Sequence, residues 1–138
     1  MKKLSLSDKE WAKRLTSEQY KVLREKKSEK PYTGDSWKSE EKGTYLCAGC
    51  HLPLFHSDHK YNPKTGWPSF WQPLNAENVF YKDDVGFFAK RVEVLCSQCD
   101  GHLGHVFNDG PQPTKKRYSI EASALKFVKD KEQHGKKT

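Results

Sequence analysis

The 138-residue sequence has few apolar residues and no long apolar run. Hydrophobic residues make up 34% of the chain, and the mean hydropathy is −0.98. Because a helix that crosses a bilayer needs about 20 mostly apolar residues, the composition excludes such a helix. Residues 1–3 lead into a charged segment without the apolar core of a secretory signal peptide. We therefore expect a cytoplasmic protein that does not act at a membrane.

The low apolar content also limits the core that the chain can build. A chain of this length forms one domain, and aromatic residues, at 12%, are too frequent for a wholly disordered protein. Small domains with a lean core are commonly stabilised by a metal or by disulfides. We therefore expect a folded domain that contains a cross-link of one of these kinds.

The net charge of +7 is concentrated at the two ends of the chain. Residues 1–30 carry 10 Lys/Arg and 5 Asp/Glu, and residues 126–138 carry 5 Lys and 2 Asp/Glu. Residues 31–125 carry 10 basic and 11 acidic side chains. A nucleic-acid-binding domain usually has a basic stripe on its folded face. The distribution therefore argues against nucleic acid as a partner and fits solvated helices and a loose tail.

Two capping boxes predict two short helices near the N-terminus. Residues 7–10 read S-D-K-E and residues 16–19 read T-S-E-Q, each with the spacing of an N-cap and an N3 residue. We predict helices over residues 7–15 and 16–27, packed against the main domain. The apolar residues expected at that contact are Trp11, Leu15, Tyr20 and Leu23.

After residue 30, turn-forming residues separate short apolar or alternating runs, which is typical of antiparallel β-structure. The predicted strands are residues 79–81, 86–89, 91–95, 117–120 and 124–127, and the short run 44–46 leads into Cys47. The expected fold is mainly β, with two antiparallel sheets in a small barrel-like or sandwich domain and two or three N-terminal helices. Residues 1–30 would form the helical segment, 31–128 a zinc-stabilised β domain, and 129–138 a basic, disordered tail.

The four cysteines form two C-x-x-C motifs, Cys47/Cys50 and Cys96/Cys99, separated by 45 residues. Each motif allows a tight turn to direct two sulfurs to one point. Two such knuckles supply the four thiolates of a tetrahedral structural zinc site. A closed site of this kind would stabilise the fold without doing chemistry itself.

Other interpretations use the same cysteines. Disulfides need an oxidising compartment, and a redox C-x-x-C is expected in a thioredoxin-like βαβ context; the sequence indicates neither. A local metal site of Cys96, Cys99, His102 and His105 has steps of three residues. It would leave the first C-x-x-C motif unexplained, and ligands from one ten-residue stretch would be cramped.

Three further segments carry a more specific signal: T-G-W-P-S-F at 65–70, G-H-L-G-H-V-F-N-D-G at 101–110 and R-Y-S-I-E at 117–121. In this order, and together with the two cysteine motifs, they closely resemble the type B methionine sulfoxide reductases, which reduce the R epimer of methionine sulfoxide. The resemblance spans about residues 6–127. It implies a monomeric protein-repair enzyme of the oxidative stress response, with one structural zinc, methionine-R-sulfoxide as substrate and thioredoxin or another thiol as reductant.

The resemblance also assigns roles to single residues. Trp67 matches the indole that packs on the substrate's methyl group. His102 and His105 match two histidines that polarise or protonate the sulfoxide oxygen. Asn108 matches a polar residue that helps to hold this network, and Arg117 matches the cation beside the nucleophile. The residues alone also allow a core tryptophan, structural histidines, a turn-forming asparagine and a surface arginine.

Ser119 stands where the family has its nucleophilic cysteine. The reaction needs a thiolate that attacks the sulfoxide sulfur and becomes a sulfenic acid, whereas a serine hydroxyl ionises far above neutral pH. All four cysteines are assigned to the metal, so no other thiol can act instead. We therefore expect an inactive chain, either a natural inactive relative or an engineered Cys-to-Ser form, which the intact surrounding motifs favour.

Two other positions differ from the family. Thr65 stands where some relatives have a resolving cysteine, which implies that a thiol reductant would act directly on the sulfenic acid of an active form. Glu121 stands where many relatives have asparagine, with an effect that the sequence does not define.

Two functions other than a reductase use some of the same residues. A serine hydrolase using Ser119 and His105 lacks the G-x-S-x-G motif. A zinc-ribbon module that binds nucleic acid or an acidic protein through its basic ends is the alternative from another class.

Overall fold

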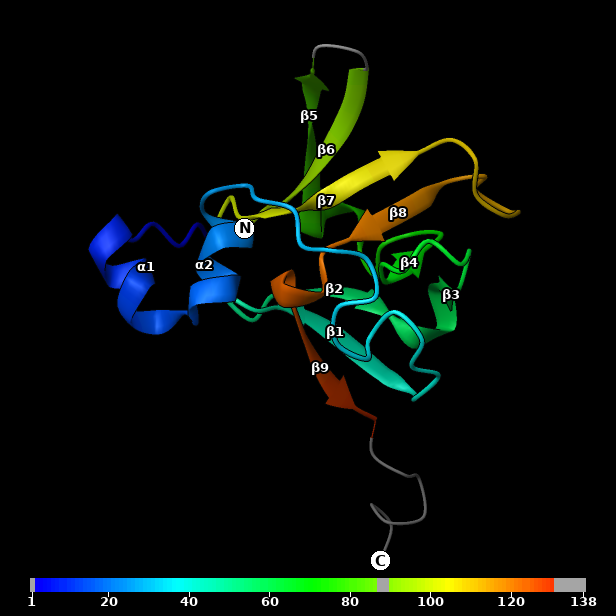
Figure 1. Ribbon diagram of the computed structural model, residues 1–138, viewed down its shortest axis with the longest axis horizontal. Helices are drawn as coiled ribbons and strands as arrows, with labels where there is room; N and C mark the ends of the chain where they lie inside the picture. The colour runs from blue at the N-terminus through cyan, green and yellow to red at the C-terminus, as the bar shows by residue number, and fades with distance from the viewer. Residues whose placement is uncertain (1, 87–89, 131–138) are drawn as a thin grey trace, which may run out of the picture.

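The computed structural model describes residues 2–86 and 90–130, in which two short α-helices precede an antiparallel β domain (Figure 1). The helices are α1 (Asp8–Arg14) and α2 (Ser17–Leu23). The strands are β1 (Gly43–Cys47), β2 (Pro53–His56), β3 (Lys60–Tyr61), β4 (Ser69–Phe70), β5 (Val79–Val85), β6 (Lys90–Cys96), β7 (His102–Phe107), β8 (Arg117–Ile120) and β9 (Leu125–Lys129). Residues 87–89 of the strand predicted over 86–89 and most of the predicted tail lie outside the described residues.

Both predicted capping boxes are present. The Glu10 N–H donates to Ser7 Oγ and the Ser7 N–H donates to the Glu10 carboxylate, and Thr16 and Gln19 make the same pair of bonds. The second helix is shorter than predicted, because it ends at Leu23 and the chain then turns through a left-handed residue, with φ of 58° at position 26. Among the described residues, neither helix has the length or apolar character needed to cross a bilayer.

The strands form two antiparallel sheets, which confirms the predicted fold class. The smaller sheet has the order β2-β1-β9, and the larger has the order β3-β4-β8-β7-β6-β5. Residues 79–85 and 90–96 form a long hairpin that extends away from the rest of the domain (Figure 1). Strands β1, β2, β3, β4 and β7 were not predicted. Three of them have four residues or fewer, and β7 lacks a regular alternation of polar and apolar residues.

Aromatic side chains fill the space between the two sheets. Phe55 of β2 stacks on Phe70 of β4, with ring centroids 4.5 Å apart, and Tyr45 of β1 packs edge-on against the same ring at 5.2 Å. Tyr118 of β8 lies 5.8 Å from Phe55. All four rings are buried, so the contact between the sheets rests on large apolar area and favourable ring geometry.

The larger sheet therefore has an apolar face and a polar face. Along β8, Tyr118 and Ile120 are buried in the core, whereas Arg117 and Ser119 are partly exposed. Since successive side chains of a strand point to opposite sides, the second pair lies on the face that is turned away from the core. This polar face carries Arg117 and Ser119, two of the residues that the family resemblance indicates.

Candidate metal site and active site

The four cysteines converge on one point, although they come from different sheets. All four are buried, and their Sγ atoms lie within 4.8 Å of one another. The Sγ atoms of Cys47 and Cys99 are 3.7 Å apart, and those of Cys50 and Cys96 are 3.4 Å apart. A tetrahedron of sulfurs with metal bonds of about 2.3 Å has edges of about 3.8 Å. The donor set therefore fits a zinc ion, and the separations exclude disulfides.

The two knuckles have the same backbone geometry. The Cys47 N–H donates to the Leu52 carbonyl at 2.8 Å, and the His51 N–H donates to the Cys47 carbonyl at 2.8 Å. The Cys96 and Asp100 N–H groups make the equivalent bonds in the second knuckle, both at 2.9 Å. His51 and Asp100 are left-handed, with φ of 67° and 63°. This repeated turn points both sulfurs of each motif in one direction.

The N-terminal helices pack on the metal knuckles. Arg14 Nε donates to the Gly49 carbonyl at 2.7 Å, and Arg24 Nη1 donates to the Cys99 carbonyl at 2.8 Å. The indole of Trp11, which is 1% exposed, lies against Gly49. The helical segment therefore contacts both turns that carry the cysteines. One turn follows β1 of the smaller sheet, and the other follows β6 of the larger sheet.

Ser119 lies in a row of polar side chains that crosses the larger sheet. It is the direct partner of Ser69 in β4 and of His105 in β7, and His105 is in turn the partner of Glu93 in β6. Directly opposed residues of antiparallel strands share a face and have close Cβ atoms. The register therefore brings the serine next to one of the two predicted histidines.

A β-bulge brings the second histidine to the same face. Residues three apart on a regular strand point to opposite sides, yet the register shifts so that Gly104 pairs with Val94 while His102 pairs with Leu95. Leu103 is the extra residue, and its side chain is buried in the core. As a result, the rings of His102 and His105 lie 5.5 Å apart.

Each histidine is bonded to a carboxylate that the sequence analysis did not single out. His102 Nδ1 lies 2.7 Å from Glu93 Oε2, and His105 Nε2 lies 2.7 Å from Asp84 Oδ2. Both nitrogens are thus engaged away from the cysteines, which does not favour the local metal site of two cysteines and two histidines. Alternation along β6 places Glu93 on the face opposite to that of the apolar residues, so the sequence pattern could have indicated Glu93 as a site residue. No sequence pattern could have indicated Asp84, because only the sheet register brings it near His105.

Burial shifts the ionisation of this group. Desolvation lowers the pKa of His102 and of His105, against the opposing effects of Glu93 and Asp84. The hydrogen bond from His105 lowers the pKa of Asp84, so this carboxylate stays ionised. Both histidines are therefore largely neutral near pH 7 in the unliganded protein.

Arg117 lies on the same strand face as Ser119, two residues away, as expected from the resemblance. Its guanidinium makes a two-bond contact with the Asp109 carboxylate, at 2.8 and 3.2 Å, and lies 4.3 Å from the centre of the Phe107 ring. This contact lowers the pKa of Asp109. Part of the arginine's charge is therefore already balanced.

Trp67 precedes β4 and runs beside the end of β8. The Ile120 N–H donates to the Pro68 carbonyl at 3.0 Å, and Ser69 Oγ donates to the Trp67 carbonyl at 3.0 Å. The indole is partly exposed, and its Nε1 is buried without a hydrogen-bond partner among the described residues. The backbone beside Trp67 is therefore held next to the end of β8.

Asn108 is not brought into this group. Its Oδ1 accepts a bond from Lys116 Nζ at 2.6 Å, and it lines a separate hollow with Val106 and Tyr118. Val106 and Tyr118 are the residues that follow His105 and precede Ser119, and they point to the other face. The contacts of Asn108 thus do not support a role in holding the histidines.

A segment after α2, residues 26–32, crosses the polar face; we call it the strap. Its Lys26 pairs with both carboxylates of the histidine group. Glu29 accepts bonds from the Ala122 and Ser123 N–H groups, just beyond Ser119. The Tyr32 N–H donates to the Gly66 carbonyl at 2.7 Å, next to Trp67. The strap therefore contacts all three parts of the candidate site.

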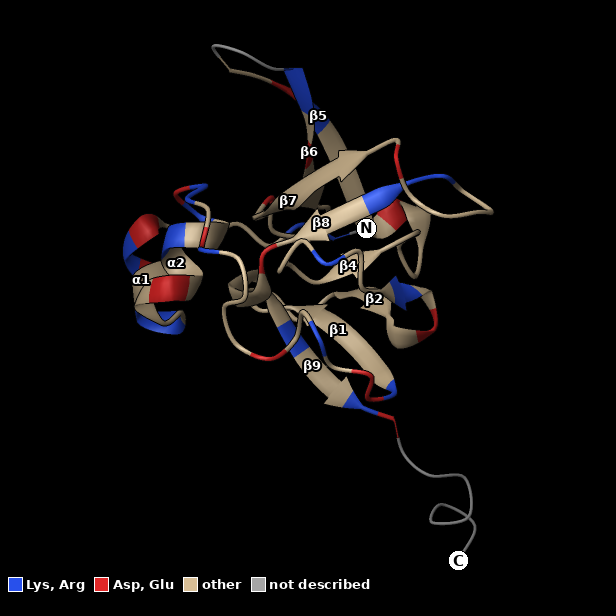
Figure 2. Cartoon of the chain, turned by 45° about the vertical axis from the view of Figure 1, so that its right-hand side comes forward, with Lys and Arg blue, Asp and Glu red and all other residues tan. Residues whose placement is uncertain are grey.

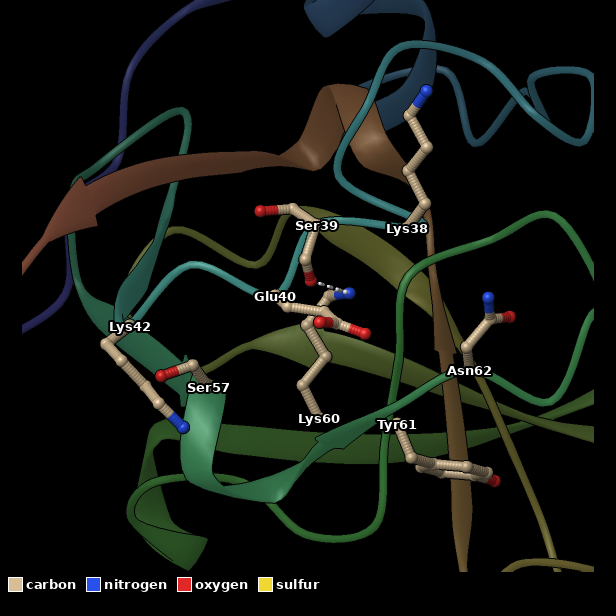
Figure 3. Close-up of a pocket in the computed structure, with 8 residues that line it drawn as sticks. All are labelled: Lys38, Ser39, Glu40, Lys42, Ser57, Lys60, Tyr61 and Asn62. Atoms are coloured by element: carbon tan, nitrogen blue, oxygen red, sulfur yellow. Dashed lines mark hydrogen bonds between the residues drawn. The ribbon is translucent and has the colours of Figure 1, made fainter.

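Another hollow of the surface lies between residues 38–42 and 57–62 (Figure 3). It measures about 420 Å³ and contains none of the predicted site residues. Its central ammonium, that of Lys60, donates to the Ser39 carbonyl at 2.8 Å and to the Trp37 carbonyl at 3.4 Å. The Lys38 side chain extends away from Lys60 (Figure 3). The hydrogen bonds of Lys60 therefore stabilise the loop that contains Trp37 and Ser39.

Comparison with known proteins agrees with this arrangement. A family model described as the SelR domain matches residues 15–129. The chain is 52% identical over 124 residues to a peptide methionine sulfoxide reductase MsrB of Leptospira interrogans, covering 90% of this chain and 95% of that protein. It is 48% identical over 127 residues to the MsrB of Hahella chejuensis, covering 92% and 91%. It is also 50% identical over 124 residues to the chloroplastic reductase B1 of Arabidopsis thaliana, covering 89% and 61%.

Proposed function

Because the chain belongs to the SelR domain family of type B methionine sulfoxide reductases, we propose that it binds methionine-R-sulfoxide and does not reduce it. The observation that carries the proposal is Ser119 on the polar face, directly opposite His105. The family's nucleophile is a cysteine, and the Sγ atoms of all four cysteines of this chain lie within 4.8 Å of one another, where they could hold a metal ion. We further propose that the bound metal is one structural zinc per chain.

The chemistry of the substitution explains the expected loss of turnover. In an active form, a thiolate at position 119 attacks the sulfoxide sulfur; with one proton taken up, the oxygen passes to the thiol as a sulfenic acid and methionine leaves. A thiol reductant such as thioredoxin then returns the sulfenic acid to the thiol and releases water, while two thiols of the reductant become a disulfide. A serine hydroxyl is not ionised near neutral pH and does not undergo this two-electron step.

The proposed pocket retains groups that suit a methyl sulfoxide. Trp67 offers an apolar ring for the methyl group, and the neighbouring histidines and Arg117 offer polar contacts for the oxygen. The substrate would be free or, preferentially, protein-bound methionine-R-sulfoxide. The surrounding polar face is partly exposed, which suits a side chain presented by another protein.

The alternative of a nucleic-acid module is not favoured. Acidic and basic side chains alternate on α1 and α2 (Figure 2), and both helices pack on the metal knuckles. This distribution gives no basic stripe of the kind that nucleic acids select.

The test is the substitution Ser119→Cys. We expect the zinc-loaded variant to reduce methionine-R-sulfoxide with dithiothreitol, and the unchanged chain and the control Ser119→Ala to show no turnover. The S epimer should not react with any of the three proteins. Titration of the unchanged chain with each epimer, followed by tryptophan fluorescence and NMR, should show binding of the R epimer.

Two results would overturn the proposal. One is turnover by the chain with Ser119. The other is a folded, zinc-loaded Ser119→Cys variant that reduces neither epimer, together with unchanged spectra of the unsubstituted chain at high ligand concentration.

A further inference from the structure

A single ammonium connects the two histidines of the candidate site. Lys26 Nζ lies 3.3 Å from Asp84 Oδ1 and 3.1 Å from Glu93 Oε1. The other oxygen of each carboxylate contacts a histidine, Asp84 with His105 and Glu93 with His102, both at 2.7 Å. These five side chains come from the strap, β5, β6 and β7. They form one continuous chain of polar contacts.

The contacts determine which ring nitrogens carry protons. An ionised carboxylate accepts hydrogen bonds and cannot donate them. The nitrogen that faces it must therefore be an N–H, which is Nδ1 in His102 and Nε2 in His105. In a neutral imidazole, the other nitrogen is then a bare acceptor. Because the two nitrogens of a ring point in divergent directions, both acceptors face away from the carboxylates.

Lys26 is held in place for this contact. It follows the end of α2 in a left-handed conformation, with φ of 58°, and the next N–H, that of Lys27, bonds back to the Lys21 carbonyl at 2.9 Å. Three residues further, Glu29 is fixed by its bonds to residues 122 and 123. The lysine side chain is 43% exposed, but its ammonium ends on two carboxylates of which Glu93 is 6% exposed and Asp84 17% exposed.

We propose that Lys26 is a positioning residue: by bridging Asp84 and Glu93, it holds His102 as the Nδ1–H tautomer and His105 as the Nε2–H tautomer. The second part of the proposal rests on the proposed function. A sulfoxide oxygen only accepts hydrogen bonds, as do the two bare nitrogens. Direct contact between them therefore requires that a histidine takes up a proton when methionine sulfoxide binds.

The charges around His102 and His105 determine whether removal of the Lys26 charge raises or lowers the pKa of these histidines. His105 faces Asp84 of β5, Arg91 and Glu93 of β6, and His102 of its own strand. Burial lowers the pKa of both histidines, the carboxylates raise it, and the positive charge of Lys26 lowers that of His102 further. Removal of this charge should therefore make protonation easier.

The first experiment measures the histidines in the ligand-free, zinc-loaded protein. Nitrogen-15 NMR should show different protonated nitrogens in His102 and His105. In Lys26→Met, we expect mixed tautomers and a titration midpoint higher by about half a pH unit or more. Lys26→Arg should retain the pattern of the unsubstituted chain.

Lys27→Met is the matched control. Lys27 has the same residue type at the adjacent position, is 66% exposed and reaches a carboxylate, that of Glu25, only at 3.9 Å. It should leave both tautomers and both midpoints unchanged. If Lys26→Met folds and behaves as Lys27→Met does, or if both histidines of the unsubstituted chain carry the proton on the same nitrogen, the positioning role is wrong.

The second experiment measures binding of methionine-R-sulfoxide by calorimetry in buffers of different ionisation enthalpy. We expect proton uptake and an affinity that rises as the pH falls from 8 toward the histidine midpoint, by at most about tenfold per pH unit for one proton. In Lys26→Met the rise should begin at higher pH. Binding without proton uptake contradicts the second part of the inference. The absence of any binding contradicts the proposed function. In that case, the NMR experiment alone decides whether Lys26 sets the tautomers.

Discussion

Ser119 and Glu121 lie two residues apart at the end of β8, and their surroundings differ sharply. Ser119 is partly exposed on the polar face, whereas Glu121 is 5% exposed. Its carboxylate accepts bonds from the Glu29 N–H at 2.9 Å and from the Ser28 hydroxyl at 3.1 Å. Burial raises the pKa of Glu121, and the nearby Glu29 carboxylate raises it further. Glu121 therefore holds the strap beside Ser119 through two hydrogen bonds, although burial of its charged carboxylate destabilises the fold.

The substitution Glu121→Gln should stabilise the protein at neutral pH. A carboxyl whose pKa is raised in the folded state binds a proton more readily there than in the unfolded chain, so it weakens the fold at high pH and less as the pH falls. Glutamine keeps one acceptor and removes the charge, and the Ser28 hydroxyl can rotate to accept its N–H. We expect a Tm higher by a few degrees at pH 8, with a smaller gain at pH 5.

Thermal unfolding at both pH values measures this effect. Glu29→Gln is the comparison, since the Glu29 carboxylate accepts two backbone N–H bonds that an amide satisfies less well. A lower Tm of Glu121→Gln at pH 8 would show that the two hydrogen bonds outweigh the cost of the buried charge.

At the scale of the elements, the pairing of β7 with β8 creates the site. Its register sets His105 opposite Ser119 and Gly104 opposite Ile120. A Cβ atom at Gly104 would lie 2.1 Å from the Ser119 carbonyl oxygen and 2.9 Å from the Ile120 Cα. Only glycine allows β8 to approach the bulged part of β7 so closely. The bulge that brings both histidines to one face therefore depends on this residue.

Gly104→Ala should force the two strands apart. We expect a loss of about 3 kcal/mol in the free energy of unfolding, or failure to fold. Gly34→Ala is the control, because Gly34 has a φ of +65° but a Cβ atom there would meet nothing within 4 Å beyond its chain neighbours. It should cost about 1 kcal/mol through backbone strain alone. Urea unfolding of both variants measures the difference, and equal losses would contradict the close-approach explanation.

At the scale of the whole molecule, the four-cysteine cluster lies where strands of the two sheets end next to each other. Cys47 ends β1 of the smaller sheet, and Cys96 ends β6 of the larger sheet. The N-terminal helices lie against the same turns, through Trp11 on Gly49 and Leu23 on Gly101. A metal bound here would therefore stabilise the two sheets and the helices together.

We expect one zinc per chain, lost to the same extent in Cys47→Ser and Cys96→Ser, with a drop of several kcal/mol in the free energy of unfolding. A chelator that strips the metal from the unsubstituted chain should have the same effect. Ser97→Ala is the matched control, because Ser97 lies inside the second knuckle and is bonded through its backbone: its carbonyl accepts from Lys3 Nζ at 2.8 Å and its N–H donates to the Asn78 carbonyl at 3.0 Å. Metal analysis and thermal unfolding test the prediction; zinc retained in Cys47→Ser would contradict the four-thiolate site.

Local patterns in the sequence were sufficient for several features. The two capping boxes start α1 and α2 as predicted, because their bonds lie within four consecutive residues. The C-x-x-C motifs at 47–50 and 96–99 predicted a four-sulfur cluster, because two-residue spacing specifies the turn itself. The apolar and alternating runs indicated two antiparallel sheets, and the three motif segments indicated the family.

The tertiary structure alone decided how the candidate site is assembled. No local pattern places Asp84 beside His105, or Lys26 on both carboxylates, because these contacts join residues from separate strands and the strap. The histidines at 102 and 105 share a face only because one bulge in β7 corrects their odd spacing. The same register leaves Asn108 with Lys116 instead of the histidines. The sequence determines which side chains could form the site, and strand register determines which of them come into contact. One added residue in a strand moves the side chains of all the following residues to the other face of the sheet.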